Sequence, residues 1–439
     1  MSIAKYLNKP QIRCGVGGIL EEHNVKNTVY FVATATAVVA VTLMAGTPAW
    51  ALGFRNPDQD ARATGQGEAF VAQADDASAI YYNPAGLTQV RGTQVTSGSY
   101  LDFPNIHFYP TGGGDFHPED KVVLLPHFYA ASDFGLERWR FGLGLNVPFG
   151  NSIDWGKSGP LQYLTTSSQL AVYNIEPTVA YQFNEHLSLG AGLNIYQANT
   201  SVERNLPVAL GGGHFRFHGN GDAFGATAGV LWKINSQHSI GLVYRSPFEI
   251  TFNGWATLQG NAMSGADANS RAGASIQFPQ SVAAGYAYRP LPKLKLEVDV
   301  DWTDWATLDN VYLRSSNPLF NAGSNPSQST IRFNWMDSFY YEFGAQYELS
   351  DHWVVRGGYI FSENTVPNSS FSPTLPDSNR HVFSIGLGYV RPPHLNMDIV
   401  YQYSLSEDRT VNGSLNSPAV DGTWKSDGHA VMVTSTLKF

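Results

Sequence analysis

Apolar and polar residues alternate along most of the chain beyond residue 92. In residues 294–302 every even position is apolar and every odd position is charged. The same period of two recurs in residues 341–349 and 395–403. Successive side chains of a β-strand point to opposite faces, so this period gathers the apolar side chains on one face. The pattern predicts a series of β-strands, each with one apolar face.

The lengths of the segments and of their connections favour a membrane barrel. The alternation alone would also suit a soluble β-sandwich, in which two apolar faces meet as a core. The alternating segments run to about ten residues, as a tilted strand needs to cross a bilayer, whereas ordinary strands average about five or six. Short connections, such as residues 184–186 and 350–352, alternate with long ones, such as residues 150–169 and 406–424. Outer-membrane barrels have this arrangement of short turns and long loops.

The C-terminus supports the same prediction. Residues 430–439 alternate and end in Phe439 on the apolar side, which is similar to the signal that the barrel-assembly machinery recognises. That machinery is therefore an expected partner. We count fourteen alternating segments, and an even number returns the C-terminus to the side of the short turns. Because closure satisfies every backbone polar group in lipid, we predict an all-β transmembrane antiparallel barrel of about 14 strands.

Composition agrees with a surface that faces lipid. Charged residues make up 14% of the chain, whereas a typical soluble domain has about a quarter. The chain also holds 25 Phe, 22 Tyr and 10 Trp. Its formal net charge of -9 argues against nucleic acid as a partner, because nucleic-acid-binding domains are basic.

The first 51 residues are predicted to be a signal peptide. An apolar stretch at residues 29–44 follows Lys26, and small residues lead to a cleavage site after Ala51. A transmembrane anchor is the alternative, but the stretch is shorter than the ~20 residues of a spanning helix. Glu21 and Glu22 fit a signal peptide poorly, so translation is predicted to start near Val25. The one cysteine, Cys14, lies in this leader, which excludes disulfides and thiol chemistry from the mature chain.

Residues 52–91 are predicted to be a plug inside the barrel. They precede the first strand, do not alternate, and are rich in Ala, Gly and Asp. A segment of this size fits inside a barrel that would otherwise enclose water. The predicted organisation is therefore a signal peptide at 1–51, an N-terminal plug at 52–91 and a transmembrane β-barrel at 92–439.

Several short motifs resemble the FadL family, the outer-membrane transporters of long-chain fatty acids and other hydrophobic compounds. They are Leu52-Gly53-Phe54, Ala63-Thr64-Gly65-Gln66-Gly67, Asn83-Pro84-Ala85, Tyr244-Arg245-Ser246, Asp301-Trp302-Thr303-Asp304-Trp305 and Leu375-Pro376-Asp377. The resemblance implies passive transport: the ligand is captured at an apolar groove between outer loops, passes to a tighter pocket inside, and leaves sideways where the third strand is kinked.

The resemblance also implies three ligand-binding positions. Arg204 matches an arginine that meets the ligand's carboxylate, for which its forked donors and permanent charge are suited. The alternative is an arginine in the lumen that is paired with an acid, near Glu203 or at Asp222. Phe54 matches an aromatic that reaches into the family's pocket; otherwise it is a packing residue of the plug. Met336 occupies the place of a second cation, which makes neutral hydrocarbons more plausible as cargo.

Two prolines, Pro84 and Pro148, are predicted to set the local course of the backbone. Asn83, Pro84 and Ala85 are predicted to shape the plug, because Pro fixes a turn, Asn caps it and Ala permits close approach to the wall. Pro148 lies late in the third strand, where the missing ladder donor would suit a lateral gap. The alternative is that Pro148 begins the outer loop.

Signatures of catalysis and metal binding are missing from the sequence. It has no G-x-S-x-G, G-x-G-x-x-G or Walker motif, so we predict no enzyme and no cofactor. His214 and His218 lie four residues apart, but we place them in a glycine-rich loop at residues 205–221 and expect no metal. This loop is shorter than the segment with which many family members form their surface groove.

We therefore predict a passive outer-membrane transporter of hydrophobic molecules, with long-chain fatty acids as the first expectation and aromatic or alkane hydrocarbons as the alternative. A general porin and an outer-membrane lipase are the rivals from other classes. Expected partners are hydrophobic small molecules and outer-membrane lipid, and we expect a monomer.

Overall fold

A computed structural model describes residues 53–262, 267–315, 317, 328–414 and 418–439. The predicted signal peptide and the predicted start near Val25 lie outside the described residues. No helix in these ranges is long and apolar enough to cross a membrane.

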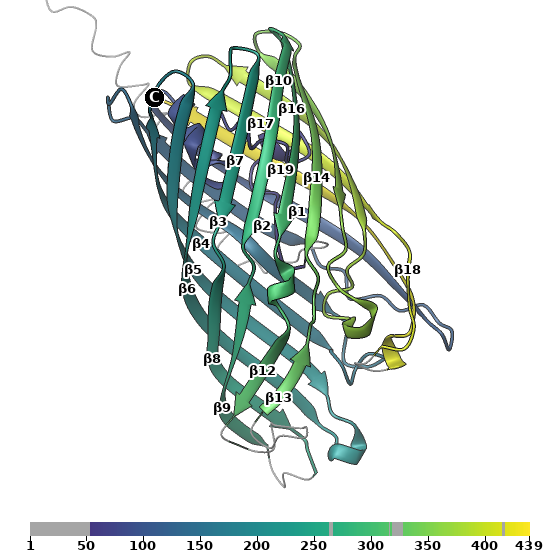
Figure 1. Cartoon of the computed structure of the whole chain (residues 1–439). Helices are drawn as coiled ribbons and strands as arrows, with labels where there is room; N and C mark the ends of the chain where they lie inside the picture. The colour runs from purple at the N-terminus through teal and green to yellow at the C-terminus, as the bar shows by residue number, and fades with distance from the viewer. Residues whose placement is uncertain (1–52, 263–266, 316, 318–327, 415–417) are drawn as a thin grey trace, which may run out of the picture. The chain divides into compact units, whose positions relative to one another are not determined.

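The described residues form one sheet of nineteen strands, and every neighbouring pair is antiparallel. The strands are β1 (Thr93–Pro110), β2 (Val123–Ser132), β3 (Trp139–Asp154), β4 (Ser167–Gln182), β5 (Leu187–Asn205), β6 (His214–Lys233), β7 (His238–Arg245), β8 (Phe248–Gln259), β9 (Ala268–Phe278), β10 (Ser281–Leu291), β11 (Leu294–Thr303), β12 (Asn310–Ser315), β13 (Gln328–Arg332), β14 (Ser338–Glu348), β15 (Trp353–Ser362), β16 (Arg380–Arg391), β17 (Leu395–Ser406), β18 (Arg409–Val411) and β19 (Gly422–Lys438). β1 pairs with both β2 and β19, so the sheet closes into a barrel (Figure 1).

The barrel has fourteen wall strands, as the sequence predicts. Five of them are each built from two of the nineteen strands placed end to end. β6, for example, pairs with β7 over one part of its length and with β8 over another. The other end-to-end pairs are β9 with β10, β11 with β12, β13 with β14, and β17 with β18.

The apolar face of the strands points outward across most of the wall. On β11, Val298 and Val300 are exposed, whereas Glu297 and Asp299 are buried inside. The apolar face therefore meets lipid and the polar face lines the lumen, which distinguishes this barrel from a sandwich.

The orientation reverses at the end of the barrel that carries the long loops. On β8, Phe248, Ile250 and Phe252 are buried, and Glu249 and Thr251 are exposed. A strand whose outward face is polar stands in water, so β8 extends beyond the lipid and encloses apolar side chains. We refer to this end as the outer end, because long loops face the outside in outer-membrane barrels.

The predicted glycine-rich loop at residues 205–221 is largely strand, which corrects the sequence interpretation. β5 continues to Asn205, a turn with the short helix η2 (Val208–Leu210) follows, and β6 begins at His214. The predicted loop at residues 150–169 is likewise shorter in the structure, because β3 continues to Asp154 and β4 begins at Ser167. The reversed orientation is the reason, since polar outward positions beyond the lipid resemble a loop in the sequence.

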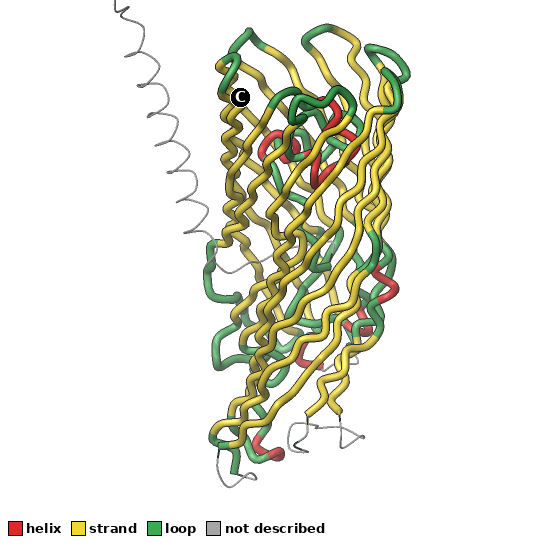
Figure 2. The backbone as a smooth tube through the Cα atoms, turned by 90° about the vertical axis from the view of Figure 1, so that its left-hand side faces the viewer, coloured by secondary structure: helices red, strands yellow, loops and turns green. Residues whose placement is uncertain are grey.

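Residues 53–91, here called the lumenal segment, lie inside the barrel. They contain α2 (Ala61–Thr64), α3 (Ala79–Tyr82) and η1 (Pro84–Gln89), and almost all of them are buried. The segment contacts the wall all around its circumference: Asn56 donates to Val147 of β3, and the amide of Ala61 donates to Thr434 of β19. Figure 2 shows these short helices within the ring of strands, toward the end at which the chain terminates.

The remaining short helices lie in connections between strands. They are η3 (Trp305–Thr307), η5 (Asn368–Ser370) and η6 (Pro418–Val420).

Candidate ligand-binding site in the lumen

Aromatic rings fill the outer half of the lumen. We call the following group the aromatic chamber: Phe54, Phe149, Tyr196, Phe248, Phe278, Trp305 and Trp335. The ring centroids of Tyr196 and Phe248 are 3.9 Å apart, and those of Phe248 and Phe278 are 4.7 Å apart. Phe54 of the lumenal segment lies 4.9 Å from Trp335, measured between ring centroids. The chamber offers an apolar ligand a wall of rings instead of water.

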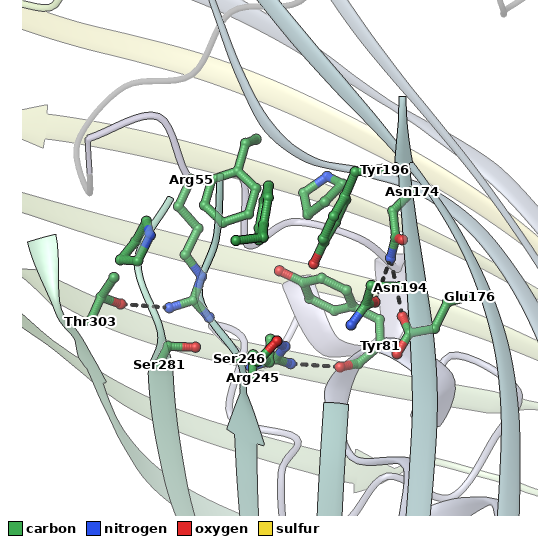
Figure 3. Close-up of a pocket in the computed structure, with 14 residues that line it drawn as sticks. Arg55, Tyr81, Asn174, Glu176, Asn194, Tyr196, Arg245, Ser246, Ser281 and Thr303 are labelled. Carbon is green, nitrogen blue, oxygen red and sulfur yellow. Dashed lines mark hydrogen bonds between the residues drawn. The ribbon is translucent and has the colours of Figure 1, made fainter. Parts of the chain in front are cut away.

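A pocket connects this chamber with polar groups of the lumen. It is lined by Phe149, Tyr196 and Phe248 together with Arg55, Glu176 and Arg245 (Figure 3). Arg55 donates to Asp301 at 2.6 Å and to Thr303 at 3.0 Å, and Arg245 donates to the carbonyl of Tyr81 at 2.6 Å. Arg55 is thus paired with a carboxylate, whereas Arg245 donates to a neutral carbonyl and Oε1 of Glu176 is buried without a hydrogen-bond partner.

Arg204 lies at the outer end of β5 and faces inward. It pairs in register with Phe215 of β6, and its guanidinium lies 5.5 Å from the centre of that ring. Its Nε atom is buried without a hydrogen-bond partner, and no carboxylate of the described residues lies within salt-bridge distance of it. The neighbouring Glu203 instead pairs with His214 and Arg216. Asp222, the alternative partner suggested by the sequence, is exposed.

Pro148 lies inside β3 and marks a break in the wall. The ladder between β2 and β3 ends at Phe128 and Leu145, and the register of β3 against β4 shifts between Asn146 and Phe149. The edge of β3 that β2 leaves free pairs with the lumenal segment: Asn56 donates to the carbonyl of Pro148, and Gly150 donates to that of Phe54. Pro148 therefore does not begin the outer loop, and Phe54 is held at the break by its own backbone.

Beside Met336, it is Trp335 whose side chain faces the aromatic chamber. Met336 is 48% exposed, whereas Trp335 is 5% exposed and faces Phe54 and Trp305. No second cation comes to the chamber from this position.

Asn83, Pro84 and Ala85 lie where the lumenal segment touches the wall. The Asn83 side chain accepts from the amide of Ala85 and donates to the carbonyls of Val71 and Val230. A Cβ at Gly190 of β5 would lie 2.3 Å from the carbonyl carbon of Pro84, so only glycine permits this approach. These contacts hold the turn at residues 83–85 close to β5 and β6.

The loop at residues 363–379 covers the outer mouth of the lumen. Phe371 packs against Trp424 at 4.9 Å between ring centroids, and Trp155 donates to the carbonyl of Pro373. Asp377 of this loop accepts from the amide of Thr365, and burial raises the pKa of its carboxyl to about 6. A ligand that arrives from outside along the barrel axis meets this loop before it reaches the aromatic chamber.

His214 and His218 lie in β6 and not in a loop. His214 bonds to Glu203 at 3.0 Å, and His218 is exposed. Within the described ranges no cluster of three or more His, Cys, Asp or Glu side chains could hold a metal ion.

Sequence reasoning did not find the polar lining of the pocket. Glu176, Asn194 and Arg245 come from three different strands, and the structure alone brings them to one cavity. Arg245 stands in the Tyr244-Arg245-Ser246 motif, but nothing in the sequence places it in a pocket. Glu176 and Asn194 are polar residues on the inward side of alternating segments.

The chain is similar to known outer-membrane proteins along most of its length. A family model described as outer membrane protein transport protein (OMPP1/FadL/TodX) matches residues 42–439. A putative outer membrane protein of Neisseria meningitidis serogroup B is 27% identical, over 94% of this chain and 98% of its own length. A long-chain fatty acid transport protein of Salmonella typhi is 22% identical, over 86% of this chain and 93% of its own length.

Two solved structures share the fold. A FadL homologue of Pseudomonas aeruginosa matches with a TM-score of 0.78 and 19% identity, over 88% of this chain and 100% of the other. The toluene transporter TodX of Pseudomonas putida matches with a TM-score of 0.69 and 16% identity, over 85% and 99%.

Proposed function

Since the chain belongs to the OMPP1/FadL/TodX family of outer-membrane transport proteins for hydrophobic compounds, we propose that its cargo is a long-chain fatty acid, taken up without a coupled energy source. The lumenal segment acts as a plug that prevents a continuous water channel, which separates this protein from a general porin. It also makes one wall of the site, through Phe54.

Arg204 carries the choice of cargo. It is an inward-facing, partly buried cation set among the apolar side chains of the outer end, and it has no acidic partner in the part of the chain that the structure describes. Leaving a buried charge unpaired is costly, and a ligand carboxylate with two oxygens would remove that cost. A fatty acid would place its head group at Arg204 and its chain along Phe215 and the aromatic chamber.

The proposed route leads sideways out of the barrel. After the ligand reaches the pocket of Arg55 and Phe149, it lies beside the end of the β2–β3 ladder. There the free edge of β3 bonds to the lumenal segment, through residues 54–56 and the side chain of Gln59. Displacement of these residues would open the wall at Pro148 to lipid. The ligand would then leave into the membrane without passing the rest of the plug.

A neutral hydrocarbon is the second candidate cargo. The chamber is lined by rings, and the position at Met336 adds no second cation. Toluene would need only the apolar surface, so its transport would not depend on Arg204.

We expect Arg204→Ala to lower the uptake of labelled oleate roughly tenfold, because a charge-assisted pair contributes about 1.5–3 kcal/mol. The measurement is uptake by cells that lack their own transporter, with labelled toluene in parallel. Arg216→Ala is the matched control, since Arg216 lies on the adjacent strand but is exposed and paired with Glu203. Equal loss of toluene uptake in Arg204→Ala would point to a structural role of Arg204, and unchanged oleate uptake would contradict the fatty acid assignment.

We expect a disulfide in His127→Cys/Asn146→Cys to block the lateral exit. The two positions continue the β2–β3 register by one residue beyond its last pair, so the bond would close the break. Under oxidising conditions ligand should still bind to purified protein, but oleate uptake by cells should fall and then recover on reduction. Undiminished uptake with the disulfide formed would exclude this exit.

A further inference from the structure

The base of the β8–β9 hairpin is bonded to neither of its neighbours in the wall. The ladder between β6 and β8 ends at Asn220 and Asn253, so residues 248–252 of β8 lie outside it. The ladder between β9 and β12 contains only Gly273 with Arg314 and Ala272 with Ser315. Among the described residues, 248–252 and 274–278 therefore form ladder pairs only with each other.

Two carbonyls of β8 in this base accept from side chains of the hairpin itself. The Asn253 side chain donates to the carbonyl of Thr251, and the Gln277 side chain donates to the carbonyl of Phe248. On the facing edge of β6, the amide of Ala226 donates to the side-chain oxygen of Ser246. The register joins no residue of 221–225 to a residue of 248–252, so separating the two stretches would break no ladder pair of the described residues.

Proline bounds the base on both strands. Pro247 lies between β7 and β8, and Pro279 lies between β9 and β10. Proline has no amide donor and is tolerated where a strand is interrupted. The two strands are interrupted at adjacent places in the wall, since β7 pairs with β10 and β8 with β9. The base is thus connected to β7 and β10 only by the chain at Pro247 and Pro279. The outer part of the hairpin is held in the wall by the ladder between β6 and β8.

The inner face of the base is part of the ligand site. Phe248 and Phe278 stack on one another, and Phe248 stacks on Tyr196 of β5, the next strand but one in the wall. Ser246, Phe248 and Pro279 also line the pocket of Figure 3. On the outer face, Phe224 of β6 is 66% exposed beside the unpaired stretch, while Glu249 and Thr251 are polar. This change from apolar to polar marks the surface of the outer leaflet.

We propose that the β6–β8 edge at residues 221–225 and 248–252 is a second side opening, through which a single-chain amphiphile in the outer leaflet enters the pocket. The chain passes between Phe224 and Phe248 toward Tyr196, while its head group stays near the polar outer face. The opening lies at a different part of the wall from the β2–β3 break and admits ligand, whereas that break releases it. The inference rests on the proposed transport function.

Cysteine cross-linking tests this opening, because the only cysteine of the sequence, Cys14, lies in the predicted signal peptide. Asp222→Cys/Thr251→Cys places two exposed thiols across the unpaired edge, two residues beyond the last pair of the β6–β8 register. Oxidation to the disulfide should lower uptake of labelled oleate by cells roughly fivefold, as expected for a locked gate, and reduction should restore it.

His218→Cys/Trp255→Cys is the matched control. It joins the same two strands on the same face, but across a pair that already belongs to the ladder, so its oxidation should leave uptake unchanged. Mass spectrometry establishes that each disulfide forms. If the bonded Asp222→Cys/Thr251→Cys protein takes up oleate at the rate of the reduced protein, the second opening is excluded. If the cysteine-free parent takes up no oleate beyond empty cells, the proposed function fails first.

Discussion

Replacing Glu297 and Asp299 together by alanine is expected to release the lumenal segment from the wall and to open a water-filled channel. Both side chains project inward from β11. Asp299 accepts from the amides of Phe70 and Val71 at 2.9 and 2.8 Å, and Glu297 accepts from those of Ala72 and Gln73 at 2.5 and 3.2 Å. Each buried amide left without a partner costs about 1–3 kcal/mol, so loss of four acceptor contacts outweighs any single contact in the segment.

The readout is ion conductance of the purified protein in planar bilayers. The double variant should show steady conductance several times that of the parent, since a freed segment leaves a fourteen-strand lumen open to ions. Val298→Ala/Val300→Ala is the matched control, because these residues lie on the same strand but face lipid. Conductance equal to that of the parent would show that other contacts suffice to hold the segment.

Gly358→Val is expected to prevent the lumenal segment from docking against β15. A Cβ at Gly358 would lie 2.0 Å from the amide nitrogen of Gly67 and 2.2 Å from the carbonyl carbon of Gln66. Both neighbours are backbone atoms, which cannot turn aside as a side chain can. We expect destabilisation of about 3 kcal/mol, at the upper end of typical overpacking, or displacement of the segment.

The neighbouring Gly357→Val supplies the control. A Cβ there would meet its nearest atom, the carbonyl oxygen of Ser384, only at 4.0 Å. Since valine favours strands and suits a lipid-facing position, this variant should be as stable as the parent. The measurement is the temperature at which the folded band disappears in heat-modifiability gels, with bilayer conductance as a second readout. Equal melting of the two variants would contradict the close contact at Gly67.

Much of the barrel could be predicted from the sequence because a spanning strand has a local signature. The perfect alternation of residues 294–302 assigns β11 and its lipid face with no reference to any other strand. A sheet in lipid must close into a barrel, because an open edge would leave backbone polar groups unpaired. Counting the alternating segments then gave fourteen strands. The motifs also led to Phe54 and Arg204, which the structure places inside the barrel at its outer half.

The same signature misled where the barrel leaves the membrane. Period two is identical whether the apolar face points out to lipid or into the lumen, so alternation cannot tell residues 214–220 of β6 from a polar loop. Whether the apolar face of a strand points outward or inward depends on what lies on each side of the wall, lipid or water. The sequence does not show where along a strand the lipid ends. The sequence likewise does not show that the strand interruptions at Pro247 and Pro279 lie side by side, because only the pairing of β7 with β10 brings them together.

The sequence by itself therefore determined the spanning strands and their count of fourteen, because alternation depends on residues close together in the chain. The tertiary structure alone decided the interior. Asp299 meets Phe70 across 229 positions, and Arg55 meets Asp301 across 246. Such contacts depend on the register and closure of the whole wall around the lumenal segment, and no local pattern of residues records that geometry.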